Sequence, residues 1–434
     1  MKSLISNKEF YKRHNKELEK YLLFKNSLHL INETSSAKVK PQGSVVKYLD
    51  LETKLNLQLE EIKSTKFELI ILSDVIEVYD DLPNLFETIN ALLIEDGNLL
   101  ITSINTKWKI PLKILEFLNF KAKTKQFSYI HSRKFENIAA GVGFDLISSK
   151  TRQFLPFKLF YLGNILNKIL EVLFFNFNLG IRSYLLFRKD NQTFKKMTKS
   201  IIIPAKNEEG NLKELVARIP KTLDTELIFS IGKSQDKTLD VALKIQQHNK
   251  DFIIKVYEQS KNGKANAVWE AVEKSEGEII AILDSDISVD PEELVNFYEI
   301  IENNYADFVN GTRLIYEMEK GSMRFINKLG NRMFQYLIGK IINEPITDSL
   351  CGTKVFKRNL SNNIFWWQNT FKLNDPFGDF DLLFAASYSG AKILEYPIHY
   401  RARTYGTTQI SRFRDGYKLI RYLYKSFLIM NTTR

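Results

Sequence analysis

The chain has 434 residues, a formal net charge of +11, and 44% hydrophobic and 26% charged residues. Its length suits two or three domains, and its composition is that of an ordinary folded protein rather than a disordered one. The single cysteine, Cys351, excludes an internal disulfide framework and a cysteine-based zinc site, and it fits the reducing cytoplasm.

Two regions bear on targeting and on the membrane. The polar first twenty residues lack the apolar core of a signal peptide, and a helix is expected at 7–25. The most apolar stretch, residues 154–187, is interrupted by lysine, asparagine and glutamate side chains. It predicts an interfacial or core segment and not a membrane span, which needs about 20 apolar residues.

Strand-like and helix-like runs alternate from about residue 44 to residue 150. Residues 67–74 and 98–104 are apolar runs typical of buried parallel strands, and 183–189 predicts a last strand. Residues 82–93 predict an amphipathic helix, whose buried face should be made of Leu82, Leu85, Phe86, Ile89 and Leu92.

A second alternation begins at residue 200, after the polar stretch 190–199. Strands are expected at 201–205, 226–231, 251–258 and 278–286, and helices at 208–219, 236–247 and 263–275. Repeated strand–helix units predict an α/β fold with a mostly parallel sheet, whose ligands bind at the carboxyl ends of the strands. We expect two domains, at 1–190 and 198–434.

Two carboxylates close the apolar run at 278–286. Asp284 and Asp286 are separated by Ser285, and residues i and i+2 of an extended strand point to the same side. Two such oxygen ligands can hold Mg²⁺ or Mn²⁺ with substrate phosphates, and the metal would neutralise a diphosphate leaving group. The alternative is a pair of solvated acids that follow a strand.

Residues 200–430 resemble the family 2 inverting glycosyltransferases with a GT-A fold. Within that family they resemble the dolichol-phosphate mannose synthase and polyprenyl-phosphate glycosyltransferase branch. The matching motifs occur in the family's order: IIIPAKNEEGNL, GKSQDKT, NGKANAV, ILDSDISVDPEEL, ITDSLCGTKVF, FGDFDLLF and YPIHYRARTYGTTQISRF. The resemblance implies a hexosyltransferase that takes its sugar from a nucleotide-sugar donor and inverts the anomeric carbon.

The resemblance also assigns roles to residues. It implies donor binding by Pro204, Ala205, Asn207, Glu208, Asp236, Lys264, Asp284, Ser285, Asp348 and Lys354. It implies phosphate contact by Arg401, Arg403, Arg412 and Arg414. It implies catalysis by Asp381, Asp379 and Asp286, where Asp381 is the family position near the acceptor and Asp379 is an equal candidate for the working acid.

Several of these residues also have a purely structural interpretation. Asn207 followed by Glu208 suits a helix start, Lys264 can be an ordinary exposed lysine, and the arginines can form a solvated basic face. Cys351 is interpreted as a small packing residue. The family's earlier acid in the GKSQDKT loop is replaced by Ile231 or Gly232, which leaves the donor base open.

Residues 67–105 resemble class I methyltransferases that use S-adenosylmethionine, and 131–146 resemble a later segment of that family. Asp74 and Glu77 would line the pocket of such a domain. Val78 replaces the family's histidine, and no glycine-rich loop follows a first strand, because Gly43 is the only glycine before Gly97. We expect a degenerate methyltransferase-like domain with a scaffolding role that does not bind S-adenosylmethionine.

The sequence therefore predicts a metal-dependent glycosyltransferase with a polyprenyl-phosphate or surface-glycan acceptor. Residues 401–434 carry eight basic residues and one acidic residue, and their helical part mixes these with apolar side chains. This pattern fits peripheral attachment to the anionic cytoplasmic face of a membrane, and no nucleic-acid partner is expected. The alternatives are a methyltransferase acting on a glycan or lipid, and a non-enzymatic module that binds sugar nucleotides or membranes.

Overall fold

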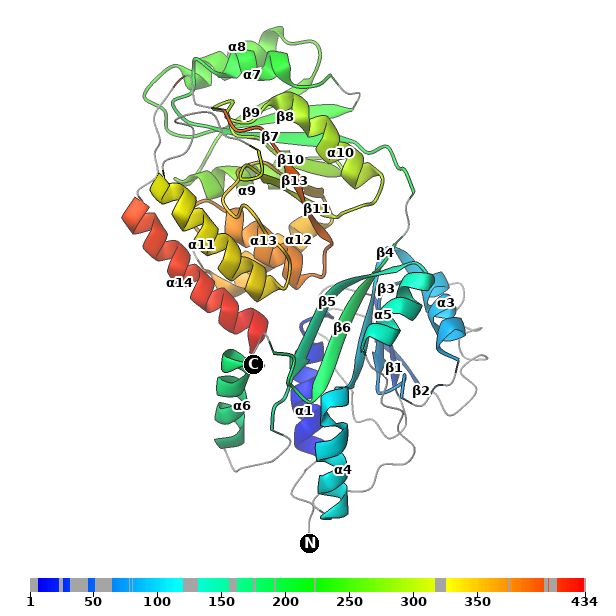
Figure 1. Ribbon diagram of the computed structural model, residues 1–434. Coiled ribbons are helices and arrows are strands. Elements are labelled where there is room, and N and C mark those ends of the chain that lie inside the picture. The colour runs from blue at the N-terminus through cyan, green and yellow to red at the C-terminus, as the bar shows by residue number, and fades with distance from the viewer. Residues whose placement is uncertain are drawn as a thin grey trace. The chain divides into compact units, whose positions relative to one another are not determined.

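The computed structural model describes residues 7–22, 26–31, 46–50, 65–77, 79, 81–119, 132–155, 162–174, 177–190, 193–221, 224–316, 325–373, 375–401, 405 and 412–432. The chain divides into two compact units (Figure 1). The first comprises residues 1–191 and 427–434, and the second comprises residues 192–426. The last eight residues thus belong to the first unit, whereas the sequence placed everything after 198 in one domain.

The N-terminal unit is built on a six-stranded sheet with the order β2-β1-β3-β4-β6-β5. The first four strands in this order are parallel, and β6 is antiparallel to both of its neighbours. The strands are β1 (Ser27–Ile31), β2 (Val46–Asp50), β3 (Phe67–Ser73), β4 (Leu93–Ile104), β5 (Phe144–Arg152) and β6 (Arg182–Lys189).

Helices cover both faces of this sheet. Helix α3 (Leu82–Leu92) and helix α5 (Ser132–Gly141) pack on one face, and the end of α1 (Asn7–Leu18) packs on the other through Leu18, together with Leu22. Asp81 caps α3 by accepting a hydrogen bond from the amide of Asn84 at 3.2 Å, which satisfies one free donor of the first turn. The predicted strands at 67–74 and 98–104 and the predicted inner face of α3 are confirmed.

The expected helix at 7–25 is shorter, because α1 ends at Leu18 and a turn follows it to residue 21. The apolar stretch 154–187 contains helix α6 (Leu162–Leu173) and most of β6. The unit also has a short 3₁₀ helix, η1 (Thr106–Trp108), and helix α4 (Lys109–Phe117). Among the helices that the structure describes, none is both long and apolar enough to cross a bilayer.

The C-terminal unit is built on a seven-stranded sheet with the order β13-β11-β12-β10-β7-β8-β9. Strands β10, β7, β8 and β9 are parallel, and β12 is antiparallel to β10 and β11. The strands are β7 (Lys199–Ala205), β8 (Thr225–Ile231), β9 (Ile253–Glu258), β10 (Ile279–Ile282), β11 (Phe308–Thr312), β12 (Lys354–Lys357) and β13 (Ile393–Pro397).

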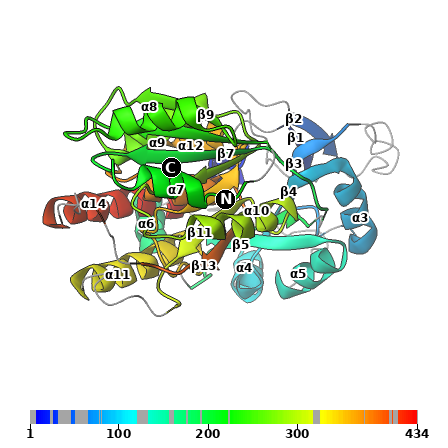
Figure 2. The same ribbon diagram turned by 90° about the horizontal axis from the view of Figure 1, so that it is seen from above.

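Helices cover both faces of this sheet too. Alternate residues of each strand point to opposite faces, and Ile201 and Ile203 of β7 pack in one core with α7 and α10. Figure 2 shows α10 on one side of the sheet and α9 and α12 on the other. The helices are α7 (Leu212–Arg218), α8 (Thr238–His248), α9 (Lys264–Lys274), α10 (Leu294–Glu302, after the 3₁₀ helix η2, Pro291–Glu293), α11 (Phe325–Ile342), α12 (Leu360–Phe371), α13 (Asp379–Tyr388) and α14 (Arg412–Asn431).

One predicted strand needs correction. The run at 278–286 was expected to stay extended through both aspartates, but β10 ends at Ile282. Asp286 accepts hydrogen bonds from the backbone amide and hydroxyl of Ser288, at 3.0 and 2.6 Å, and Ile287 has a positive φ of 52°. Aspartate readily closes such local turns, so the acidic pair lies in the loop after the strand rather than on the strand itself.

Candidate active site at the carboxyl ends of β7 and β10

An ion pair between Lys264 and Asp284 lies at the carboxyl edge of the sheet. The ammonium nitrogen of Lys264 and Oδ1 of Asp284 are 2.5 Å apart, and both side chains are about one-third exposed. Lys264 is the first residue of α9 and follows Gly263, whose φ of +107° suits glycine. Burial acts to lower the pKa of Lys264, but the carboxylates of Asp284, Asp379 and Asp286 outweigh it and raise that pKa.

Gly352 lets the main chain pass directly beneath this ion pair. A Cβ atom at this position would overlap the carboxylate of Asp284 and would lie 2.9 Å from the Lys264 nitrogen. The loop before β12 therefore closes one side of the site, and only a glycine leaves room for the carboxylate there.

A second ion pair joins this loop to helix α13. The ammonium nitrogen of Lys354 lies 2.7 Å from Oδ1 of Asp379 and also donates a hydrogen bond to the backbone oxygen of Cys351. Both side chains are almost fully buried. Burial raises the pKa of the Cys351 thiol to about 12, so this cysteine stays protonated and serves as a small packing residue.

Asp381 points away from these lysines. Two residues along a helix correspond to about 200° of rotation, so Asp379 and Asp381 lie on opposite sides of α13. Asp381 accepts hydrogen bonds from the hydroxyl of Tyr422 at 2.6 Å and from Gln368 at 3.1 Å. Tyr422 in turn accepts one from the indole of Trp367 at 2.9 Å, so this carboxylate links α12, α13 and α14.

The sequence analysis missed Asp375, which caps helix α13. Its carboxylate accepts hydrogen bonds from the backbone amides of Phe380 at 2.7 Å and Asp381 at 3.1 Å. Burial, together with the charges of Asp381 and Asp379, raises the pKa of Asp375 to about 7. The sequence Asp-Pro-Phe-Gly before a helix was the available signal, because aspartate and proline are common at helix starts.

The loops after β7 and β8 are tied to each other by their own polar side chains. The amide of Glu209 donates to Asp236 at 3.2 Å, and the amide of Gln235 donates to Asn207 at 2.7 Å. The amide of Glu208 donates to the hydroxyl of Thr238 at 2.9 Å.

The loop after β7 begins with an unusual backbone conformation. Asn207 has a positive φ of 56°, and Pro204 and Ala205 end β7. The same loop reaches the acidic pair, because the hydroxyl of Ser285 donates to the backbone oxygen of Pro204 at 3.0 Å.

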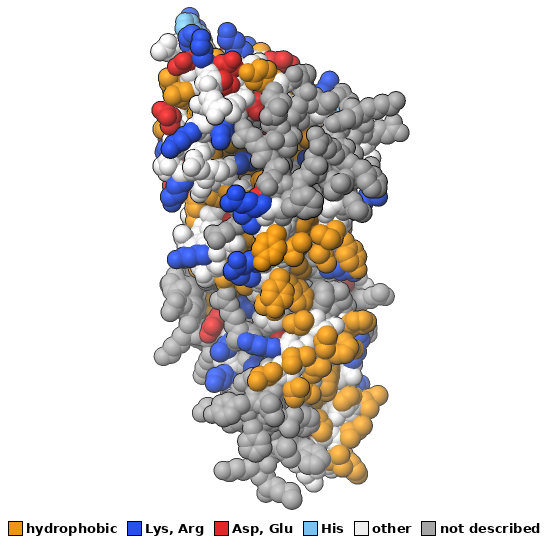
Figure 3. Space-filling view, turned by 90° about the vertical axis from the view of Figure 1, so that its left-hand side faces the viewer, with side chains coloured by type: hydrophobic (Ala, Val, Ile, Leu, Met, Phe, Trp, Pro, Cys, Tyr) orange, Lys and Arg blue, Asp and Glu red, His pale blue; other side chains and the backbone are white. Residues whose placement is uncertain are grey.

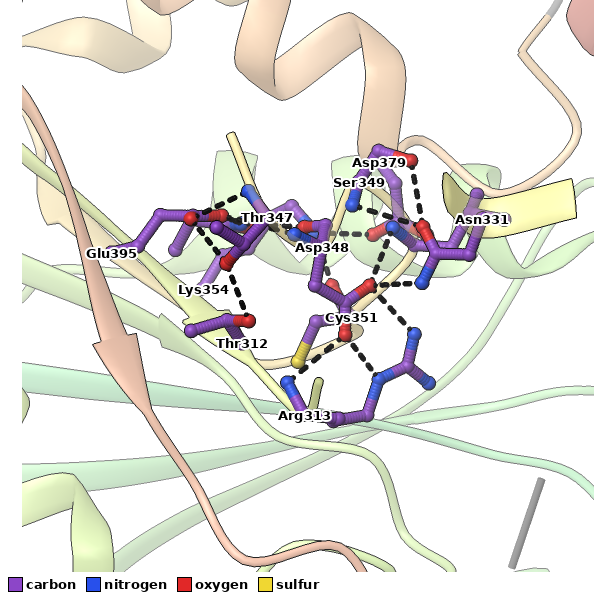
Figure 4. Close-up of polar contacts among 12 residues, drawn as sticks. Thr312, Arg313, Asn331, Thr347, Asp348, Ser349, Cys351, Lys354, Asp379 and Glu395 are labelled. Carbon is purple, nitrogen blue, oxygen red and sulfur yellow. Dashed lines mark hydrogen bonds and ion pairs between the residues drawn. The ribbon is translucent and has the colours of Figure 1, made fainter. Parts of the chain in front are cut away.

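Asp348 is fully enclosed by hydrogen-bond donors (Figure 4). Its carboxylate accepts hydrogen bonds from the guanidinium of Arg313 at 2.6 and 2.9 Å and from Asn331 at 2.6 Å. Burial acts to raise the pKa of Asp348, but Arg313 and the hydrogen bonds outweigh it and lower that pKa. The adjacent Glu395 accepts from the amide and hydroxyl of Thr347, both at 2.6 Å. This network fixes the loop before β12, and no sequence motif predicts that Arg313 and Asn331 bind Asp348.

The structure describes only part of the predicted basic group. Arg401 is half exposed, and its guanidinium binds Asp290 at 2.8 Å. Its backbone amide donates to the oxygen of Ser288 at 2.9 Å, so this segment runs beside the loop that follows Asp286. Arg414 is exposed. Arg403 and the side chain of Arg412 lie outside the described residues.

The carboxyl end of β3 in the N-terminal unit carries a different polar cluster. The buried guanidinium of Arg182 lies 2.6 Å from Oδ1 of Asp74, and the hydroxyl of Tyr11 donates to Oδ2 at 2.8 Å. Burial and the nearby Asp74 raise the pKa of Glu77 to about 8, and Glu77 accepts a hydrogen bond from the amide of Ile104 at 3.1 Å. Of the two acids that would line a methyltransferase pocket, Asp74 is thus held by side chains of the unit itself and Glu77 by a backbone amide.

Comparison with known proteins assigns each unit. Residues 200–365 match the model of glycosyl transferase family 2, and residues 13–149 match the model of a methyltransferase domain. The C-terminal half carries a family 2 glycosyltransferase domain. The resemblances drawn from both halves of the sequence are confirmed at the level of family and fold.

Three of the similar proteins are named as hexosyl, hexose or mannosyl transferases. A low-salt glycan biosynthesis hexosyltransferase of Haloferax volcanii is 26% identical over 52% of this chain and 53% of its own length. A dolichyl-phosphate hexose transferase of the same organism is 27% identical over 50% of this chain and 88% of its own length. A dolichol-phosphate mannosyltransferase of Pyrococcus furiosus is 24% identical over 53% and 63% of the two chains. The chain spans about half the length of the first of these relatives.

Among solved structures, glucosyl-3-phosphoglycerate synthase of Mycobacterium tuberculosis in complex with Mn²⁺, uridine diphosphate and phosphoglyceric acid is a distant neighbour. It is 17% identical, covers 53% of this chain and 78% of its own, and has a TM-score of 0.40.

Proposed function

We propose that the C-terminal unit transfers a sugar, with inversion, from a nucleotide-sugar donor to a polyprenyl-phosphate or surface-glycan acceptor. The observation that carries this proposal is the cluster of Lys264, Asp284, Lys354 and Asp379 around Gly352. Family 2 relatives that act on dolichyl phosphate support the acceptor class. A methyltransferase activity is not proposed, because Asp74 is held by Arg182 and Tyr11.

The donor's diphosphate is proposed to bind beside Lys264. The start of helix α9 offers backbone amides and a cationic side chain, and both attract phosphate oxygens. The joined loops after β7 and β8, with Asn207, Glu208 and Asp236, are proposed to hold the nucleotide. Asp348 is proposed to act indirectly, because its carboxylate holds Arg313 and the loop that precedes Lys354.

Asp284 and Asp286 are proposed to hold Mg²⁺ or Mn²⁺. No group of three or more acidic, histidine or cysteine side chains in the described part of the chain is arranged to bind a metal. Two carboxylates nevertheless fit such an ion, since magnesium is commonly held by one or two carboxylates and the substrate's phosphates. When bound, the metal would neutralise the charge that develops on the leaving diphosphate.

Asp379 is proposed to face the acceptor. Its carboxylate can take the proton of a hydroxyl acceptor as the new bond to the anomeric carbon forms. A phosphate acceptor is already ionised near neutral pH, and for it the lysines would position the attacking oxygen. We assign this role to Asp379 rather than Asp381, because both oxygens of Asp381 are engaged by Tyr422 and Gln368.

Helix α14 is proposed to bring the domain to the cytoplasmic face of a membrane. Tyr417, Ile420 and Tyr424 are exposed on it, and Lys418 and Arg421 lie among them. Apolar and aromatic side chains with interspersed cations are typical of helices that lie in an anionic lipid interface.

The decisive experiment measures nucleotide release. The purified full-length protein would be incubated with Mg²⁺ or Mn²⁺ and a panel of UDP- and GDP-sugars, with and without polyprenyl phosphate. We expect metal-dependent release from one donor, and Asp284→Asn should reduce it by about 10²-fold or more. Equal release by the variant, or release without metal, would refute the proposed metal role. No release from any donor in folded protein would refute the proposed transfer.

A further inference from the structure

Helix α6 of the N-terminal unit buries its polar side and exposes its apolar side. Asn167 and Glu171, on its polar side, are buried. Asn167 accepts hydrogen bonds from the amides of Phe154 at 2.8 Å and Leu155 at 2.9 Å, and Glu171 accepts one from the amide of residue 153 at 3.3 Å. A surface helix normally buries its apolar face and exposes its polar one. These hydrogen bonds hold α6 in the reverse orientation.

The apolar side of α6 consequently faces outward. Ile165, Ile169 and Leu173 follow one another at helical spacing and are 55%, 47% and 61% exposed. Because the polar side is hydrogen-bonded to the body of the unit, this exposure is a property of the fold and not of a loosely placed helix.

Helix α4 also presents an apolar side outward. Ile110, Ile114 and Phe117 lie on one side of the helix and are 71%, 52% and 85% exposed, whereas Leu112 on the opposite side is buried. Singly scattered exposed apolar residues need no explanation, but two helices that each present a continuous apolar side form a patch that does.

The two helices belong to one surface. The segment after α6 is pinned to the start of α4, because the indole of Trp108 donates to the backbone oxygen of Leu179 at 2.7 Å. The ammonium of Lys107 donates to the backbone oxygen of Phe177 at 3.2 Å, and the side chain of Phe177 is 61% exposed. Hydrophobic side chains gather on the face of the molecule shown in Figure 3.

The positive charge on and next to α4 and α6 indicates the kind of partner that this surface binds. Lys107, Lys109, Lys113 and Lys168 are exposed on or next to the two helices. Residues 105–126 contain six lysines and one acidic residue. A protein partner would need a matching acidic and apolar surface, whereas a bilayer with anionic headgroups offers both properties at one depth.

We propose that the N-terminal unit docks on an anionic membrane surface through α4, α6 and residues 177–180, which follow α6. The six side chains that enter the interface are Ile110, Ile114, Phe117, Ile165, Ile169 and Leu173, which we call the apolar face. The methyltransferase-like unit is then a membrane-docking module. This inference does not depend on sugar transfer by the other unit.

The test is flotation of the full-length protein with vesicles, in the absence of any donor. Phosphatidylcholine vesicles are compared with vesicles that also contain phosphatidylglycerol. One variant replaces Ile110, Ile114 and Phe117 with glutamine, and another replaces Ile165, Ile169 and Leu173. Each should lower partitioning onto anionic vesicles by about tenfold or more, because each removes three apolar side chains from the interface.

A matched control separates docking from general loss of apolar surface. Phe194, Leu243 and Ile253 are 65%, 39% and 69% exposed in the C-terminal unit, and their triple replacement with glutamine should leave partitioning unchanged. A dye on Phe117→Cys should shift to the blue on anionic vesicles, and the same dye on Ile253→Cys should not. Labelling is specific because Cys351, the only native cysteine, is buried.

Two results would overturn the proposal. One is wild-type partitioning by both triple variants, which would leave α14 as the sole membrane contact. The other is a lipid-independent oligomer that dissociates when the apolar face is replaced, because the face would then bind a second copy of the chain. Retained melting temperatures of both variants exclude unfolding as the cause of lost binding.

Discussion

In the N-terminal unit Asp74 follows β3, and in the C-terminal unit Asp284 follows β10 by two residues. Both acids stand at the carboxyl end of a buried parallel strand, where α/β proteins place their ligands. Asp74 meets the buried guanidinium of Arg182, whereas Asp284 meets the ammonium of Lys264, whose side chain is partly exposed. The same position in the same class of sheet thus holds an internal ion pair in one unit and an accessible one in the other.

The difference shows that an acidic strand end does not by itself define a site. Arg182 is almost completely buried, and Tyr11 donates a second hydrogen bond to Asp74. At Asp284 the main chain passes at Gly352 without a side chain, and the Asp284 side chain keeps 29% of its surface exposed. The predictions below test whether the first pair is structural and the second functional.

The largest effect is expected from breaking the internal pair. Asp74→Asn leaves Arg182 buried without its counter-charge, which should cost about 3–5 kcal/mol of stability in the N-terminal unit. Asparagine is chosen because it tolerates the positive φ of 58° at this position. Calorimetry should show a lower unfolding temperature for the N-terminal unit. Nucleotide release, measured below that temperature, should be unaffected. Adding Arg182→Met should restore most of the lost stability. Loss of sugar transfer in folded Asp74→Asn protein would show that the Asp74–Arg182 pair is not purely structural.

Filling the space at Gly352 should strongly reduce activity without unfolding the protein. In Gly352→Ala the new methyl group competes with the carboxylate of Asp284, so we expect nucleotide release to fall by about 10²-fold or more. Gly330→Ala is the matched control, because nothing lies within 4 Å of a Cβ atom there, and alanine favours its helix. Equal activity of the two variants would show that the position of the Asp284 carboxylate does not limit nucleotide release.

The two carboxylates of α13 should separate function from stability. Asp379→Asn removes the partner of Lys354 at the site, and release should fall by about 10²-fold. Asp381→Asn places an amide group next to the donors of Gln368 and Tyr422, so it should cost about 1–3 kcal/mol of stability and leave turnover nearly unchanged. The reverse result in paired kinetic and unfolding measurements would return the catalytic role to Asp381.

The sequence predicted more of the fold than of the site. Alternating apolar runs placed most strands and helices, since burial of one face imposes a period that local residues reveal. It also named Lys264, Asp284 and Lys354. It did not reveal that Arg182 would close over Asp74, because these residues are 108 positions apart and nothing local marks the pair.

The sequence also could not distinguish Asp379 from Asp381 as the working acid. Their environments depend on the helical rotation of α13 and on Tyr422, 41 residues beyond Asp381. The end of β10 was misplaced for a related reason. An apolar run shows which residues are buried, but the turn at Asp286 depends on its hydrogen bonds to Ser288.

The last prediction concerns the pH dependence of stability in the C-terminal unit. The pKa of Asp375 is raised to about 7 in the folded protein, above about 3.9 for an unfolded aspartate. The folded state therefore binds one proton more between these values, and this contribution to stability is full below pH 4 and is lost as the pH rises through 7. The slope attributable to this group is at most about 1.4 kcal/mol per pH unit.

Asp375→Asn should remove that slope while keeping the cap. The amide oxygen of asparagine can still accept from Phe380, and asparagine is a good residue at helix starts. Unfolding free energies of variant and wild type, measured by denaturant between pH 4 and 8, should diverge across this window and run parallel above it. Parallel curves throughout would mean that Asp375 is ionised in the folded protein, so that the cap of α13 holds a charge beside Asp379 and Asp381.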